Sequence, residues 1–140
     1  MIIGRKIRRL IAGKTNGRCG YCGMPQLGPR RLIPEHMIPA SRGGTDDADN
    51  LVPACNSCNV RKRNMTVEEF RAYIPELLAS RVVILGGSFY DYEGYISREA
   101  IEEIVKEFEN IAVKVRKLDV RFFMERIHDP DSWRTSFDEY

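Results

Sequence analysis

No apolar run in these 140 residues approaches the roughly 20 residues that a membrane-spanning helix needs. The first ten residues interleave Arg and Lys with aliphatic side chains, so they lack the continuous apolar core of a signal peptide. We find no internal repeat, and the length suits one domain of ordinary size. These absences predict a cytoplasmic protein with no membrane partner, in which disulfides are rare.

Cysteine is scarce, and all four cysteines fall in two Cys-x-x-Cys pairs, Cys19/Cys22 and Cys55/Cys58. A two-residue spacer lets one tight turn present both sulfurs of a pair to a tetrahedral Zn²⁺. The 32 residues between the pairs exceed the separation of about 15 to 20 found in ordinary zinc ribbons, and leave room for a β-hairpin. We therefore predict a structural zinc site that supplies much of the folding free energy of this half. Four unligated thiols or a redox pair are the alternative.

No single sign of charge dominates the chain, with 22 Lys/Arg against 20 Asp/Glu, but the two halves differ. Residues 1–64 hold 12 basic and 4 acidic side chains, a net charge of +8, and residues 65–140 hold 10 and 16, a net charge of −6. Clustered Lys and Arg neutralise phosphates and release counterions, so the basic half predicts contact with a polyanion. Side chains that only solubilise the surface are the alternative. The candidate phosphate contacts are Arg5, Arg8, Arg9, Arg18, Arg30, Arg31, Arg42, Arg61, Lys62 and Arg63.

Hydrophobic periodicity predicts an α+β fold. In the first half we expect a helix over 5–14, an extended segment over 30–38, a polar loop over 41–49, a short strand over 50–53 and a helix from 58 onward. Two features are more specific: Pro34 requires an edge position or a bulge in the first strand, and Gly43-Gly44 indicate turn positions with unusual dihedral angles.

The second half mixes helical and strand patterns. We expect a capping box from Thr66 to Glu69, a helix interrupted at Pro75, and a helix from Ser97 to about residue 110. A buried strand over 81–87 and a half-buried strand over 118–125 are also predicted. The chain is accordingly divided into a domain over 1–80 and an α/β extension over 81–140 of unknown role.

Histidine is scarcer than cysteine, with two residues against four, and one of the two, His36, adjoins Glu35 in the predicted hairpin. Glu35 offers a carboxylate oxygen and Asn59 a carbonyl oxygen, which are the ligands that Mg²⁺ or Mn²⁺ prefers. Neighbours in a strand point to opposite faces, so one can bind metal while the other addresses a water. Lys62 lies three positions after Asn59 on the same helix face, where it can meet phosphate oxygens. A lone histidine is more often structural, which is the interpretation favoured for His128.

Several elements of this stretch follow one another in order: Glu35-His36-x-x-Pro39, Gly43-Gly44, Asn50-Leu51 and Cys55-x-x-Cys58-Asn59-x-x-Lys62. Together they resemble the HNH endonucleases, or ββα-metal finger nucleases, in their four-cysteine zinc-stabilised form. The resemblance covers about residues 13–73. It implies a zinc-stabilised ββα-metal core and a metal-dependent DNA endonuclease.

The resemblance also implies a role for each matching position. His36 would be the general base that activates water, and Glu35 with Asn59 would hold a catalytic Mg²⁺ or Mn²⁺ that stabilises the leaving 3′-oxygen. Asn50 would tie the loop and orient His36, and the four cysteines would hold structural zinc. Asn59 stands where many members have histidine, and Glu35 where many have aspartate. Pro34 before it is less typical.

Two other functions remain open. A non-catalytic zinc-dependent DNA-binding module needs no base, so the combination of Glu35, His36, Asn59 and Lys62 argues against it. Alternatively, residues 81–140 form an interaction domain that recruits the nuclease half. The expected partner is double-stranded DNA, and a homodimer is expected because one site per chain cuts only one strand.

Overall fold

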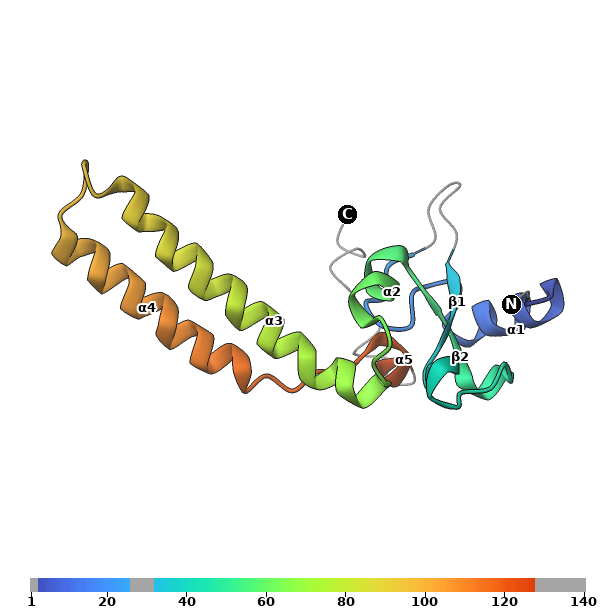
Figure 1. Ribbon diagram of the computed structural model, residues 1–140. Coiled ribbons are helices and arrows are strands. Elements are labelled where there is room, and N and C mark those ends of the chain that lie inside the picture. Colours follow the sequence, from blue (N-terminus) through green and yellow to red (C-terminus); the bar gives the residue numbers. More distant parts are fainter. Residues whose placement is uncertain (1–2, 26–31, 128–140) are drawn as a thin grey trace. The chain divides into compact units, whose positions relative to one another are not determined.

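The computed structural model describes residues 3–25 and 32–127, and these form two compact units (Figure 1). The first unit comprises Met1–Glu68 together with Arg121–Tyr140, and the second comprises Glu69–Val120. The α+β prediction is confirmed, because helices accompany one two-stranded antiparallel sheet. The division does not follow the predicted boundary at residue 80, which falls inside a continuous helix.

The sheet pairs β1 (Ile33–His36) with β2 (Leu51–Ala54), so both strands are edges, as Pro34 requires. The register sets Pro34 opposite Pro53. The N–H of Met37 donates to the Asn50 carbonyl at 2.8 Å, and hydrogen-bonded pairs alternate along an antiparallel ladder. The two prolines therefore face each other at a non-hydrogen-bonded pair, where neither strand needs an N–H. This arrangement explains how a strand with Pro34 forms at all.

Two helices flank the sheet in the first unit. Helix α1 (Arg5–Lys14) has the predicted bounds, but of its apolar face only Ile11 is buried, while Leu10 stays 59% exposed. Helix α2 (Asn56–Lys62) begins directly after Cys55, earlier than predicted, because Cys55 caps it. Helix α2 contacts β1 and α1 contacts β2, which completes a ββα core with α1 added.

The chain returns to the first unit at Arg121. Both Phe122 and Phe123 are buried, and α5 (Phe123–Arg126) begins there. The N–H of Met124 donates to the Gly20 carbonyl at 2.7 Å, and the Phe122 ring meets Tyr21 edge-on at 5.0 Å between centroids. The predicted strand over 118–125 is therefore wrong. Two adjacent buried side chains break strand alternation, and their packing against the first cysteine pair decides the structure instead.

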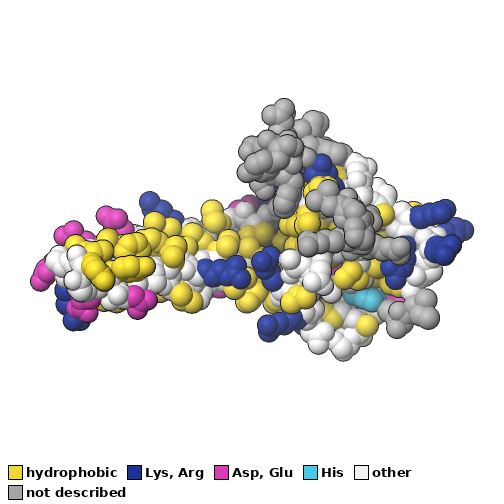
Figure 2. All heavy atoms as spheres, turned by 90° about the horizontal axis from the view of Figure 1, so that it is seen from above, with side chains coloured by type: hydrophobic (Ala, Val, Ile, Leu, Met, Phe, Trp, Pro, Cys, Tyr) yellow, Lys and Arg dark blue, Asp and Glu magenta, His cyan; other side chains and the backbone are white. Residues whose placement is uncertain are grey.

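The second unit is a helical hairpin of α3 (Val67–Gly87), η3 (Ser88–Tyr92) and α4 (Arg98–Arg116). Helices α3 and α4 run antiparallel side by side (Figure 1): Glu76 pairs with Arg116 at 3.4 Å. A Cβ at Gly86 would lie 2.6 Å from the Phe108 side chain, so glycine there permits close approach of the helices. Hydrophobic side chains remain exposed along this hairpin (Figure 2).

The structure corrects three predictions for this half. Residues 81–87 are the last turns of α3, not a strand, because a short apolar run does not distinguish the two and the helix continues. Pro75 does not interrupt α3, in which it is buried. Where the structure describes residues 81–140, up to Ile127, it has helices and no strand in place of the predicted mixture of strands and helices. The predicted helix start is confirmed: Ser97 Oγ accepts a hydrogen bond from the Ala100 N–H at 3.2 Å.

The segment Val67–Tyr92 also corrects the expectation that no apolar run has the length of a membrane span. By length and composition it qualifies, with a window of mean hydropathy 1.2 that is 17% buried. Core helices of soluble proteins pass the same test, so this property alone assigns no membrane location.

Candidate metal centre and active site

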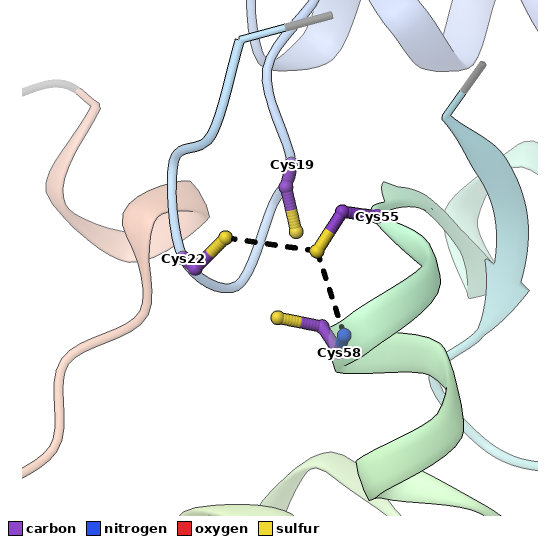
Figure 3. A group of neighbouring side chains, drawn as sticks. All are labelled: Cys19, Cys22, Cys55 and Cys58. Carbon is purple, nitrogen blue, oxygen red and sulfur yellow. Dashed lines mark hydrogen bonds between the residues drawn. The ribbon is translucent and has the colours of Figure 1, made fainter. Parts of the chain in front are cut away.

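The four cysteines converge from two separate turns (Figure 3). Their sulfur atoms all lie within 4.8 Å of one another, and the sulfurs of Cys22 and Cys55 are 3.8 Å apart. Zn–S bonds of about 2.3 Å in a tetrahedron require sulfur separations of about 3.8 Å. The cluster thus has the dimensions and the donor chemistry of a four-thiolate zinc site.

Each pair is shaped by its own backbone. In the first, the Gly23 N–H donates to the Cys19 carbonyl at 2.9 Å, and Gly23 takes a φ of 78°, which favours glycine. In the second, the Cys58 N–H donates to Cys55 Sγ at 3.4 Å, so one sulfur caps α2. Both turns therefore hold their sulfurs in place through main-chain contacts.

The thiols resist ionising together. A hydrogen bond from Cys22, then one from Cys58, lowers the pKa of Cys19 to about 2. The same bond raises the pKa of Cys22 to about 12, and the bond to Cys19 likewise raises the pKa of Cys58. One thiolate therefore suppresses its neighbours, and a divalent cation supplies the charge that lets all four ionise.

Glu35 lies beneath the surface with both carboxylate oxygens engaged. It is 6% exposed; Oε1 accepts from Lys62 Nζ at 2.6 Å, and Oε2 accepts from the Tyr21 hydroxyl. Burial raises the pKa of Glu35, while the bonds from Lys62 and Tyr21 oppose that rise. Burial and then the Glu35 charge raise the pKa of Tyr21, which keeps its hydroxyl a donor. Each carboxylate oxygen retains a second lone pair for a cation.

Lys62 is fully buried, with 0% of its surface exposed. Its ammonium also donates to the His36 carbonyl oxygen at 2.8 Å. This burial contradicts the prediction that Lys62 meets phosphate oxygens. Instead Lys62 links α2 to β1, because its ammonium donates to the Glu35 carboxylate and to the His36 carbonyl.

His36 lies beside Glu35 in β1, and its ring is held from the loop that follows. Its Nε2 lies 2.9 Å from Oδ1 of Asp46, with the histidine side chain 19% exposed and the aspartate 48% exposed. With Nε2–H donating to Asp46, Nδ1 is left as the acceptor. The sequence offered one faint signal for Asp46, its place among acidic residues after Gly43-Gly44.

Asn50 ties this loop together. Its Oδ1 accepts from the Ile38 N–H at 2.9 Å, and its Nδ2 donates to the carbonyls of Ile38 and Thr45 at 3.0 and 2.8 Å. The contact that orients the His36 ring comes from Asp46, so Asn50 acts on His36 only by holding the loop. Gly43 has the predicted unusual φ, at 89°, whereas Gly44 is required for space: a Cβ there would lie 1.7 Å from the Ile38 oxygen.

An open depression of about 270 Å³ is lined by two of the four predicted catalytic side chains, His36 and Asn59, whereas Asn50 and Lys62 do not line it. Glu35, His36, Asn59 and Arg63 all line it. Asn59 reaches it from α2, one residue after Cys58, so the cysteine cluster sets where Asn59 lies. Carboxylate, imidazole and amide groups at one concave place suit a divalent cation and a phosphate.

The HNH endonuclease family model matches residues 19–65, which contain the cysteine cluster and this depression. The chain contains an HNH domain. No curated protein and no solved structure matches the chain.

The HNH domain and α1 carry most of the predicted phosphate contacts. Of the arginines predicted to contact phosphate, those that the structure describes as exposed are Arg5, Arg8, Arg9, Arg42, Arg61 and Arg63. Arg18 is only part-exposed; it donates to the Gly23 carbonyl and lies over the Phe123 ring, so its contacts are structural. Arg30, Arg31 and His128 lie outside the described residues.

Proposed function

We propose that this HNH domain is a metal-dependent endonuclease that hydrolyses phosphodiester bonds in double-stranded DNA, in the cytoplasm. The observation that carries the proposal is the shared depression in which Glu35, His36 and Asn59 meet beside the cysteine cluster. The HNH family is generally one of nucleases, which supports the same reaction class. Zinc at the four cysteines would be structural.

The proposed reaction starts at His36. Asp46 holds the imidazole through Nε2, so Nδ1 takes a proton from water as that water attacks the phosphorus in line with the leaving group. When bound by Glu35 and Asn59, Mg²⁺ or Mn²⁺ would stabilise the charge on the 3′-oxygen. Lys62 and Tyr21 keep the Glu35 carboxylate aimed by donating to its two oxygens. The exposed arginines of α1 would contact the backbone of the duplex without reading its sequence.

A plasmid nicking assay tests the proposal. We expect the protein to convert supercoiled plasmid to nicked or linear forms with Mg²⁺ or Mn²⁺, and expect EDTA to stop it. His36→Ala should lower the rate by about 10²- to 10⁴-fold, which is the contribution of a general base. Zinc content and DNA affinity of the variant, measured by mass spectrometry and gel shift, should stay unchanged.

The main competing function is a zinc-dependent DNA-binding module without cleavage. It predicts a gel shift by the wild-type protein and no nicking with either ion. Cleavage at the wild-type rate by His36→Ala would instead contradict the assignment of the base while leaving a nuclease in place.

A further inference from the structure

Helix α3 is apolar on two sides. The side that packs on α4 carries small residues, Ala79, Val82 and Gly86, spaced by three and four positions. A second set of apolar side chains lies elsewhere around the helix: Leu78 is 41%, Ile84 69% and Leu85 58% exposed. A helix that is apolar all round is ordinarily buried all round.

Helical geometry places Leu78 and Leu85 on the same side of the hairpin as apolar residues of α4. Leu85 comes directly before the inward-facing Gly86, and on α4 Ile111 comes directly before the inward-facing Ala112. At 100° per residue in two antiparallel helices, positions just before the inward residue lie on one side of the hairpin. We define the second apolar face as the residues Ile74, Leu78 and Leu85 of α3 with Ile104 and Ile111 of α4.

The hairpin has little core of its own. Six of the 52 residues in the second unit are buried: Phe70, Pro75, Ala79, Gly86, Ile101 and Ala112. Three of the six are alanine or glycine, so they bury little apolar surface. On the second apolar face Leu78 is 41%, Leu85 58% and Ile111 46% exposed, and neighbouring exposed apolar side chains of this kind mark interaction sites. A standard interface buries ~800 Å² per partner, so the contact would also need side chains that flank this face.

Charge narrows the choice of partner. Residues 88–110 hold seven Asp/Glu and two Lys/Arg, a net charge of −5. This acidity disfavours DNA and anionic lipid, which would be repelled. Helix α4 also carries Glu102 and Glu109 away from the second apolar face, so the hairpin cannot insert into a bilayer as a unit. With DNA and lipid disfavoured, the partner that fits this face is a protein with an apolar helical face of its own.

We propose that the second apolar face binds the same face of a second copy of this chain, so that two hairpins form a four-helix bundle. Two antiparallel helices with one open apolar side are half of such a bundle, and a two-fold axis makes the contact self-complementary. The core that each hairpin lacks is then formed between copies. The proposal concerns assembly and does not depend on cleavage.

Sedimentation equilibrium of the full-length protein tests this, with a chain mass of 16.1 kDa as reference. We expect twice that mass for the wild type and the single-chain mass for the double variant Leu85→Glu/Ile111→Glu. The matched control is Val83→Glu/Val113→Glu, which adds the same charges to exposed positions on the other side of the hairpin, where the residues are 38% and 48% exposed. It should keep the dimer.

Circular dichroism identifies any variant that loses helix. If Leu85→Glu/Ile111→Glu loses helix, Leu85→Ala/Ile111→Ala is tested instead. This alanine variant should raise the dimer dissociation constant by about tenfold or more. A monomeric wild type, or equal loss of the dimer in both glutamate pairs, would overturn the proposal. So would flotation of a monomeric wild type with neutral phosphatidylcholine vesicles, which would show that lipid covers the face.

Discussion

Asp46 and His36 are ten positions apart, yet Oδ1 of one lies 2.9 Å from Nε2 of the other. The contact crosses from the loop to β1, and the loop that carries Asp46 is held by the side chain of Asn50. A carboxylate on one ring nitrogen selects the tautomer whose other nitrogen accepts a proton. Asp46 is therefore a positioning residue for the proposed base.

Asp46→Ala should lower kcat of plasmid nicking by about 10- to 100-fold with little change in KM, because the ring loses its orientation while DNA contacts remain. Asp46→Asn keeps an oxygen acceptor and should recover much of the rate. Asp49→Ala removes the same charge from the same loop and should cut normally. If the Asp46 and Asp49 variants behave alike, Asp46 contributes only local charge.

Gly44→Ala should destabilise the protein and lower the cleavage rate. The added Cβ would lie 1.7 Å from the Ile38 carbonyl oxygen and 2.9 Å from Asn50 Nδ2, so the loop that carries Asp46 must move. Overpacking of this kind costs about 1–3 kcal/mol of unfolding free energy, which thermal denaturation measures. Gly13→Ala is the control, because its Cβ meets nothing within 4 Å. Equal melting temperatures for the two variants would contradict this account.

The site was the most predictable part of the molecule, because spacing encodes its chemistry. Paired cysteines require a common ion, and Glu35-His36 with Asn59 need only a hairpin and a short helix to meet. The structure brings all of them together. The side chains that contact His36 and Glu35 were not predictable from spacing. Asp46, which contacts His36, is one of several acidic residues in its loop, and Lys62, which contacts Glu35, lies 27 positions away in the sequence.

Elements whose conformation depends on distant packing were the least predictable. Residues 81–87 form a short apolar run that suits a strand or a helix equally, and the approach of Gly86 to Phe108 decides for the helix. The strand pattern fails at Phe122 and Phe123, which are adjacent and both buried. The Phe122 ring packs edge-on against Tyr21, and the Phe123 N–H donates to the Tyr21 carbonyl at 3.0 Å. In both places a partner far along the chain outweighs local pattern.

Lys62→Met should destabilise the domain by about 3–5 kcal/mol, because it leaves the Glu35 carboxylate buried without its cation. Both groups are buried, with Lys62 0% and Glu35 6% exposed. Denaturant unfolding measures the loss, and the exposed neighbour gives the control, Arg61→Met, which should unfold like the wild type. A stable Lys62→Met protein with weakened DNA binding would instead favour a phosphate contact.

Removal of the proposed structural zinc should unfold the HNH domain and abolish the proposed cleavage, because the ion would join the two cysteine turns. The protein should bind one equivalent of zinc per chain, measured by mass spectrometry. Cys55→Ser/Cys58→Ser should bind none, since serine hydroxyls do not replace thiolates at zinc.

Adding Mg²⁺ to this zinc-free variant should not restore nicking, because the depression holds its shape only while α2 lies against β1. Cleavage by the zinc-free variant at the wild-type rate would refute the idea that the cysteine cluster holds Asn59 in place.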